Sequence, residues 1–296
     1  MSTDPVLIAN DHLTATIADL GAELQSLDLP DGRPLLWHGD PAFWAGRAPV
    51  LFPIVGRAPG DRIAVHGQTA PMAQHGFARR SRFTLTAADA RSCRHELAAS
   101  AETRAIYPCD FRLAITHALD GARLTIRAEV TNEGQTPMPF GFGFHPAFLW
   151  PLPGAAGRVH RVVLDNGASP ALARLEGGFL PEQRHPSPFD GGVLQLDPAQ
   201  FATDAMIFPE GAGSGLTYGA EGGPALQFRF ENLPHLALWS KPGAPFVCIE
   251  PWHGMAARCG GPPDIAARPG SILLAAGASA RFACQITLAD GGSGAA

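Results

Sequence analysis

The chain has 296 residues, of which 46% are hydrophobic and 17% charged, and its net charge is −5. This composition is typical of a globular protein with a sizeable core and excludes general disorder. Because Lys and Arg do not cluster, we expect no nucleic-acid partner and no anionic membrane partner. No apolar run approaches the roughly 20 residues that span a bilayer, and the N-terminal residues lack the basic and apolar regions of a secretory signal.

The cysteines point to a reducing compartment. There are five of them, an odd number, and no two form a Cys-x-x-Cys pair. This pattern indicates reduced thiols and neither a disulfide framework nor a zinc site. The chain also lacks motifs for nucleotides or metals. We therefore expect a cytoplasmic protein with no cofactor and no bound metal.

Alternation of apolar and polar residues predicts strands along most of the chain. In chain order these are residues 13–17, 23–29, 83–87, 93–99, 111–119, 123–131, 162–164, 226–231 and 280–288. Asp120 and Gly121 give a hairpin signal between two of these strands. Helices are expected only as short turns at 41–44 and 198–201, because 34 Gly and 28 Pro interrupt longer windows.

Many short strands with turn residues between them predict an all-β fold, a large antiparallel sandwich. All-β chains of this length form single domains, and the sequence shows no linker, composition shift or internal repeat. Residues 1–290 are therefore predicted to form one domain. Residues 151–192 are rich in loop signals, and residues 291–296 are predicted to be a flexible tail.

Three stretches, at 74–79, 141–148 and 246–252, concentrate the reactive side chains. In the last two, His145 and Glu250 each precede a proline at the end of an apolar, strand-like run. The residue before a proline is pushed to extended geometry, and the proline cannot donate to a sheet ladder. We therefore expect both side chains to project into a cleft from the end, or from a break, of a strand.

Residue type alone leaves two interpretations for each of these groups. His145 is either a structural histidine among apolar neighbours or a proton donor. Glu250 shares a strand face with Cys248 and Phe246, where a carboxylate costs free energy unless it is paired or used. It is therefore either the buried partner of an arginine or a general base.

Four motifs together resemble a known family. They are residues 40–57, which include Trp44 and end in Leu-Phe-Pro-Ile-Val-Gly-Arg, His-Gly-Phe-Ala-Arg at 75–79, Gly-Phe-His-Pro-Ala-Phe at 143–148 and Ile-Glu-Pro-Trp at 249–252. With these motifs in this order along the sequence, the chain resembles the aldose 1-epimerase (galactose mutarotase-like) superfamily, and in particular its LacX-type branch. The resemblance implies a β-supersandwich with a sugar cleft on one broad sheet face. It also implies an isomerase that interconverts the α and β anomers of an aldose.

The resemblance assigns catalytic roles to three residues. It implies that His145 is the general acid that protonates the ring oxygen of the sugar. Glu250 matches the general base that takes the proton of the anomeric hydroxyl. His75 matches a second histidine, which hydrogen-bonds near the ring oxygen. The chemistry that these roles imply needs no metal and no cofactor.

The same resemblance suggests residues that bind the sugar. Arg57 matches the arginine that binds sugar hydroxyls. Asp204 is the candidate for the family's substrate-binding aspartate, although Asp204 also suits a turn. Arg79 and Trp252 lie inside the matching motifs and are further candidate contacts. The expected partner is a small-molecule sugar.

Two other functions remain open at the level of sequence. A hexose-6-phosphate 1-epimerase would need a phosphate-binding arginine, for which Arg47, Arg57, Arg79 and Arg80 are candidates. A catalytically silent carbohydrate-binding protein could have the same fold, although it would not need an acid and a base. Glycoside hydrolysis requires two facing carboxylates, and Glu250 is the only clear candidate for a catalytic carboxylate in the sequence. The sequence does not decide which sugar is bound, or whether the protein is a monomer or a homodimer.

Overall fold

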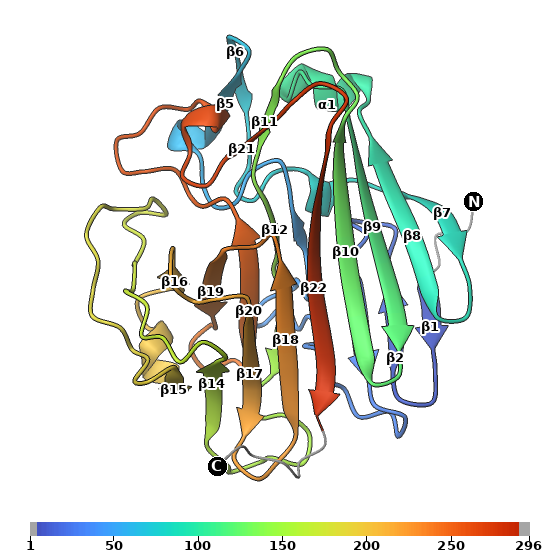
Figure 1. The fold of residues 1–296 in the computed structure, drawn as a ribbon, viewed down its shortest axis with the longest axis vertical. Helices are drawn as coiled ribbons and strands as arrows, with labels where there is room; N and C mark the ends of the chain where they lie inside the picture. Colours follow the sequence, from blue (N-terminus) through green and yellow to red (C-terminus); the bar gives the residue numbers. More distant parts are fainter. Residues whose placement is uncertain (1–4, 290–296) are drawn as a thin grey trace.

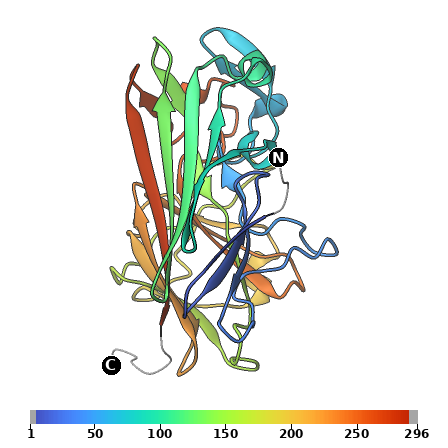
Figure 2. The same cartoon turned by 90° about the vertical axis from the view of Figure 1, so that its right-hand side faces the viewer.

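A computed structural model describes residues 5–289, so the tail predicted at 291–296 lies outside the described residues. The described chain is built mainly from antiparallel strands, which confirms the predicted all-β sandwich. Figure 1 shows the long strands of the larger sheet face-on. Figure 2 shows them on one side of the molecule, with the N-terminal strands in blue on the other.

Nine strands form the larger sheet. In spatial order they are β15 (Val193–Gln195), β14 (His160–Leu164), β17 (Gly215–Ala220), β18 (Ala225–Glu231), β22 (Ser279–Ala289), β10 (Arg123–Asn132), β9 (Phe111–Asp120), β8 (Ser92–Ala98) and β7 (Thr84–Ala88). The predicted hairpin is the β9–β10 pair, with Gly121 at a φ of 54° in its turn. Buried and exposed residues alternate along β18, as expected for a strand between core and solvent.

Six strands form the smaller sheet, which carries the site described below. They are β16 (Met206–Phe208), β19 (His235–Trp239), β20 (Phe246–His253), β12 (Phe142–Phe144) and β4 (Val50–Leu51) in spatial order, with β13 (Ala147–Leu149) also paired to β20. Almost every residue of β20 is buried. This central strand is therefore covered on both faces.

Three small sheets and short helices complete the described chain. The remaining strands are β1 (Val6–Ala9), β2 (Thr14–Ile17), β3 (Leu24–Asp28), β5 (Arg62–Val65), β6 (Gln68–Pro71), β11 (Met138–Phe140) and β21 (Ile272–Leu274). The helical segments are η1 (Pro59–Asp61), η2 (Ala78–Arg80), α1 (Ala101–Ile106), η3 (Pro198–Phe201) and η4 (Ile265–Ala267). The helical turn predicted at 198–201 is confirmed, whereas residues 41–44 form only a hydrogen-bonded turn. None of the helices within residues 5–289 has the length and apolar character needed to cross a membrane.

The two main sheets pack face to face through aromatic side chains. The rings of Phe148 on β13 and Phe228 on β18 lie 5.2 Å apart, and those of Phe142 on β12 and Phe282 on β22 lie 4.7 Å apart. Side chains on the other face of the smaller sheet form two separate apolar clusters. Because side chains alternate along a strand, the residues of β20 that do not point into the main core face these outer clusters.

Candidate active site

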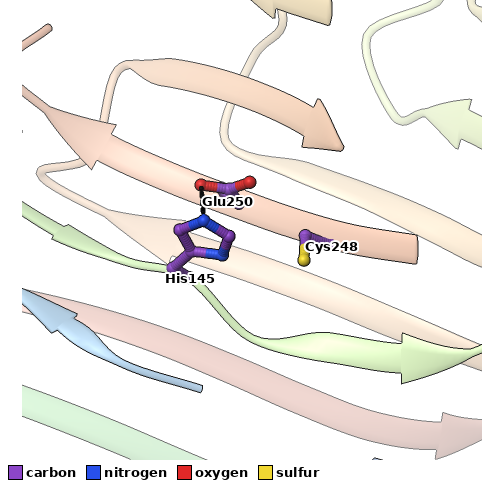
Figure 3. Close-up of side chains that lie close together, drawn as sticks. All are labelled: His145, Cys248 and Glu250. Carbon is purple, nitrogen blue, oxygen red and sulfur yellow. Dashed lines mark ion pairs between the residues drawn. The ribbon is translucent and has the colours of Figure 1, made fainter. Parts of the chain in front are cut away.

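His145 and Glu250 face each other across two neighbouring strands. In the register between β12 and β20, Gly143 lies opposite Trp252, and β13 continues the same register further along β20. This register places His145, in the break between β12 and β13, opposite Glu250. Nε2 of His145 lies 3.3 Å from Oε2 of Glu250, and Figure 3 shows the imidazole reaching across to the carboxyl group.

Two prolines interrupt the hydrogen-bond ladder beside this pair. β20 continues past Pro251 to His253, so of the two predicted positions, the end or a break of a strand, Glu250 does not occupy the end. Ile249 donates its N–H to the Pro146 carbonyl at 3.0 Å. The backbone nitrogens of Ile249 and Pro251 are two residues apart on β20, so both face the neighbouring β12–β13 segment. Because the nitrogen of Pro251 carries no hydrogen, it donates no hydrogen bond there. The ladder is therefore broken while β20 itself stays continuous. His145 does lie at a strand break, as predicted.

A cleft of about 410 Å³ opens on the outer face of the smaller sheet. This volume is within the range of small-molecule sites, about 300–1,000 Å³. Of the seven site residues proposed from the sequence, the structure brings six to the lining of this cleft. They are His75, Arg79, His145, Asp204, Glu250 and Trp252.

Arg57 is the proposed residue that the structure does not bring into the cleft. Its side chain forms an ion pair with Asp61, with Nε and Oδ1 2.9 Å apart. Its guanidinium also lies over the ring of Phe179, 5.8 Å from the centroid. Arg57 therefore lies beside the loop that carries Leu175 into the cleft, and 43% of its side chain is exposed.

Aromatic rings enclose the imidazole of His145. Trp44 stacks on it with ring centroids 4.9 Å apart, and Trp239 meets it edge-on at 5.8 Å. Burial lowers the pKa of His145 well below its usual value, and the nearby His75 and Arg79 lower it further. The imidazole is therefore held mainly neutral. Our sequence analysis missed both tryptophans as site residues, because the family resemblance over residues 40–57 includes Trp44 without assigning it a role and no motif surrounds Trp239.

The carboxyl group of Glu250 is almost completely buried, with 2% exposure. Burial raises its pKa well above the usual value, and the negative charge of Asp204 raises it further. Arg79 and the indole N–H of Trp252 act in the opposite direction. Burial therefore disfavours the charged form of both groups, the imidazolium of His145 and the carboxylate of Glu250.

His75 has a fixed tautomer. The backbone N–H of Gly56 donates to its Nδ1 at 3.1 Å, so the hydrogen of the neutral ring is on Nε2. Burial lowers the pKa of His75 to about 3, with Arg79 and Arg80 contributing. His75 therefore stays neutral at physiological pH, and its Nε2 lies 3.2 Å from the side-chain amide of Gln74, which turns its oxygen toward the ring if it is to accept from the Nε2–H.

One cation and one acid complete the cleft lining. Arg79 makes no hydrogen bond or ion pair with any of residues 5–289, and burial lowers its pKa. Asp204 adopts a φ of 70°, and its carbonyl oxygen accepts from Nη1 of Arg174 at 2.7 Å. Asp204 is thus both a turn residue and a lining residue. Both charged groups can hydrogen-bond to hydroxyls of a polar ligand.

Comparisons with known proteins agree with this geometry. The family model described as Aldose 1-epimerase matches residues 4–169, more than half of the chain. Protein LacX (plasmid) of Lactococcus lactis subsp. lactis is 32% identical over 260 residues, which cover 84% of this chain and 87% of LacX.

Two solved structures share the fold over almost their full length. A galactose mutarotase related enzyme from Lactobacillus acidophilus has a TM-score of 0.90 and 27% identity, with 97% of each chain covered. A galactose mutarotase-like protein from Lactobacillus casei has a TM-score of 0.89 and 29% identity, with 96% of this chain and 100% of that chain covered. The chain therefore belongs to the aldose 1-epimerase family and is an isomerase of the epimerase type.

Proposed function

We propose that this protein is an aldose 1-epimerase that interconverts the α and β anomers of a free aldose by opening and reclosing the sugar ring. The reaction needs one group that accepts the proton of the anomeric hydroxyl and another that gives a proton to the ring oxygen. The observation that carries the proposal is the facing pair of His145 and Glu250, 3.3 Å apart in the cleft lining.

In the proposed mechanism Glu250, as a carboxylate, takes the proton of the anomeric hydroxyl. His145, as an imidazolium, gives its proton to the ring oxygen while the bond from C1 to that oxygen breaks. The open-chain aldehyde then turns about its C1–C2 bond and recloses with the two roles exchanged. This returns both side chains to their starting states. A positioned acid or base of this kind typically contributes about 10²–10⁴-fold.

In this mechanism one proton moves between Glu250 and His145, and its position controls which group acts as acid and which as base. Burial alone places it on Glu250, whereas the charge of Arg79 lowers the pKa of Glu250 and favours the carboxylate. Moving the proton to His145 requires a transfer between atoms only 3.3 Å apart. The resulting carboxylate and imidazolium attract each other in a site of low dielectric. Because either group can hold the proton, the pair serves ring opening and ring closure alike.

The remaining lining residues orient the sugar. The Nε2–H of His75 is a fixed donor suited to the ring oxygen or to the aldehyde oxygen of the open chain. Asp204 accepts from, and Arg79 donates to, hydroxyl groups. Trp252 presents an aromatic surface beside Glu250 on the same strand face.

A hexose 6-phosphate is the second candidate substrate. Arg79 has no ion-pair partner among residues 5–289, and Arg80 also lines the cleft, so two cations are available for an anionic substituent. Arg47 and Arg57 do not line the cleft. Nε of Arg47 instead donates to the His38 carbonyl at 2.7 Å.

The rate of anomer interconversion tests the proposal. Polarimetry or exchange NMR would be run on glucose, galactose, xylose, arabinose and glucose 6-phosphate, with buffer alone as the reference. Acceleration for at least one free aldose supports the proposal. Acceleration for glucose 6-phosphate alone would favour the second candidate. Saturable sugar binding without acceleration would instead indicate a silent carbohydrate-binding protein.

A further inference from the structure

Cys248 places a thiol beside the proposed catalytic pair. It lies two residues before Glu250 on β20, so both side chains face the outer side of the sheet. One ring nitrogen of His145, Sγ of Cys248 and a carboxylate oxygen of Glu250 lie within 4.8 Å of one another (Figure 3). All three side chains are buried. The proposed mechanism gives this thiol no role.

The spacing of the pair matches that of two ligands of one zinc ion. Zinc binds imidazole nitrogen and carboxylate oxygen at about 2.0–2.2 Å in a tetrahedron, which puts two such ligand atoms about 3.4 Å apart. Nε2 of His145 and Oε2 of Glu250 are 3.3 Å apart. The sulfur of Cys248 would approach to about 3.5–3.7 Å, a movement on the order of 1 Å. The fourth position would face the cleft, which His145 and Glu250 both line.

One proposed ligand atom of this group lacks a hydrogen-bond partner among the described residues. It is Oε2 of Glu250, which is buried and faces Nε2 of His145 at 3.3 Å without a hydrogen bond between them. A buried polar atom without a partner costs free energy, and a bound cation is one arrangement that would satisfy this oxygen. A thiolate and a carboxylate would also neutralise the charge of a divalent cation, so the buried complex would carry no excess charge from these three ligands.

We propose that His145, Cys248 and Glu250 form a binding site for a thiophilic divalent cation such as Zn²⁺, and that this cation inhibits the enzyme by occupying both catalytic groups. Binding releases the protons of the thiol and the carboxyl group to solvent and changes no oxidation state. Mg²⁺ and Ca²⁺ prefer oxygen ligands and would not compete for this set. The inhibition rests on the proposed function, whereas the binding does not.

Inhibition is measured on the full chain after removal of metals with a chelator. Zn²⁺ would be titrated into the anomer-interconversion assay with wild type, Cys248→Ala and Cys259→Ser, and Mg²⁺ would be the control ion. Cys259 is an exposed thiol and is the matched control. We expect Cys248→Ala to keep its basal rate and to need at least about tenfold more Zn²⁺ for half-inhibition. Cys259→Ser should behave as wild type. Equal sensitivity of Cys248→Ala and wild type would overturn the proposal.

Binding is measured separately with Co²⁺, which reports its ligands by absorption and needs no sugar. We expect a thiolate-to-cobalt charge-transfer band in wild type and Cys259→Ser, and its loss in Cys248→Ala. The band would remain if the chain turned over no sugar, so failure of the proposed function and failure of the metal site are distinguishable. A band that persists in Cys248→Ala would rule out the site. Cys248→Ser repeats both measurements with less change in side-chain volume.

Discussion

His145, in the break between β12 and β13, lies opposite Glu250 on the antiparallel strand β20, and their facing atoms lie 3.3 Å apart. Opposite positions in an antiparallel pair have their Cα atoms about 4.5–5.5 Å apart, so the sheet itself fixes the distance between the two side chains. The rings of Trp44 and Trp239 then restrict the imidazole from two directions. The pair is therefore preorganised by the backbone register and by packing.

The pH dependence of activity should move in opposite directions in two cleft variants. Activity falls when the pH drops below the pKa that governs the carboxylate of Glu250. Asp204 raises that pKa and Arg79 lowers it. Asp204→Asn should therefore shift the acid limb of kcat/KM to lower pH, and Arg79→Gln should shift it to higher pH. Shifts in the same direction would show that neither charge acts on Glu250 as described.

Glu250→Gln should stabilise the fold while lowering activity by about 10²–10⁴-fold. The pKa of Glu250 is raised in the folded state above its usual 4.5, so its contribution to stability is lost as the pH rises through the folded pKa. The amide never ionises. At pH 8 we expect the variant to be more stable by about 1–3 kcal/mol, with the difference disappearing near pH 4. Denaturant unfolding at both pH values measures this. A less stable variant at pH 8 would mean that the carboxylate is well paired.

Gly143→Ala should disturb Trp252. An added Cβ would lie 2.5 Å from Cδ1 of this indole, which would have to move within the cleft. We expect a loss of about 1–3 kcal/mol in stability together with lower activity. Gly141→Ala is the matched control, because its Cβ would meet nothing closer than 3.5 Å. Equal effects of the two substitutions on unfolding and activity would argue against this contact.

Arg57→Ala should affect catalysis less than Arg79→Ala. Arg57 is paired with Asp61 outside the cleft lining, and an exposed ion pair contributes little. We expect kcat/KM to fall by less than about fivefold for Arg57→Ala, and by about tenfold or more for Arg79→Ala. If Arg57→Ala were the more damaging change, Arg57 would have to reach the sugar through a movement of its loop.

The long strands of the larger sheet were predictable because one face is buried and the other exposed. The strands predicted at 111–119, 123–131, 226–231 and 280–288 all lie within one residue of β9, β10, β18 and β22. The short strands β12, β13 and β16 have no such alternation, since they are covered on both faces. Nothing in their sequence shows which strands they pair with. Helix α1 was missed because its six residues are shorter than the window that a helical pattern requires.

The motifs identified most residues of the cleft but not how they meet. The contact between His145 and Glu250 depends on the register between β20 and the β12–β13 segment, which local patterns do not encode. Pro251 suggested the end of a strand, but it is accommodated within β20 because the ladder is already interrupted at Pro146. Arg57 was misplaced for a similar reason. Its motif says nothing of Asp61, the neighbour that pairs with it.

The decisive experiment compares anomer interconversion by wild type, Glu250→Gln, His145→Asn and the double variant on the best free aldose. We predict acceleration by wild type and a loss of about 10²–10⁴-fold in each single variant. The double variant should be little worse than the poorer single variant, because the two groups act as a unit. Wild-type rates in either single variant, or no acceleration by wild type on any free aldose, would contradict the proposal that this buried pair opens and closes the sugar ring.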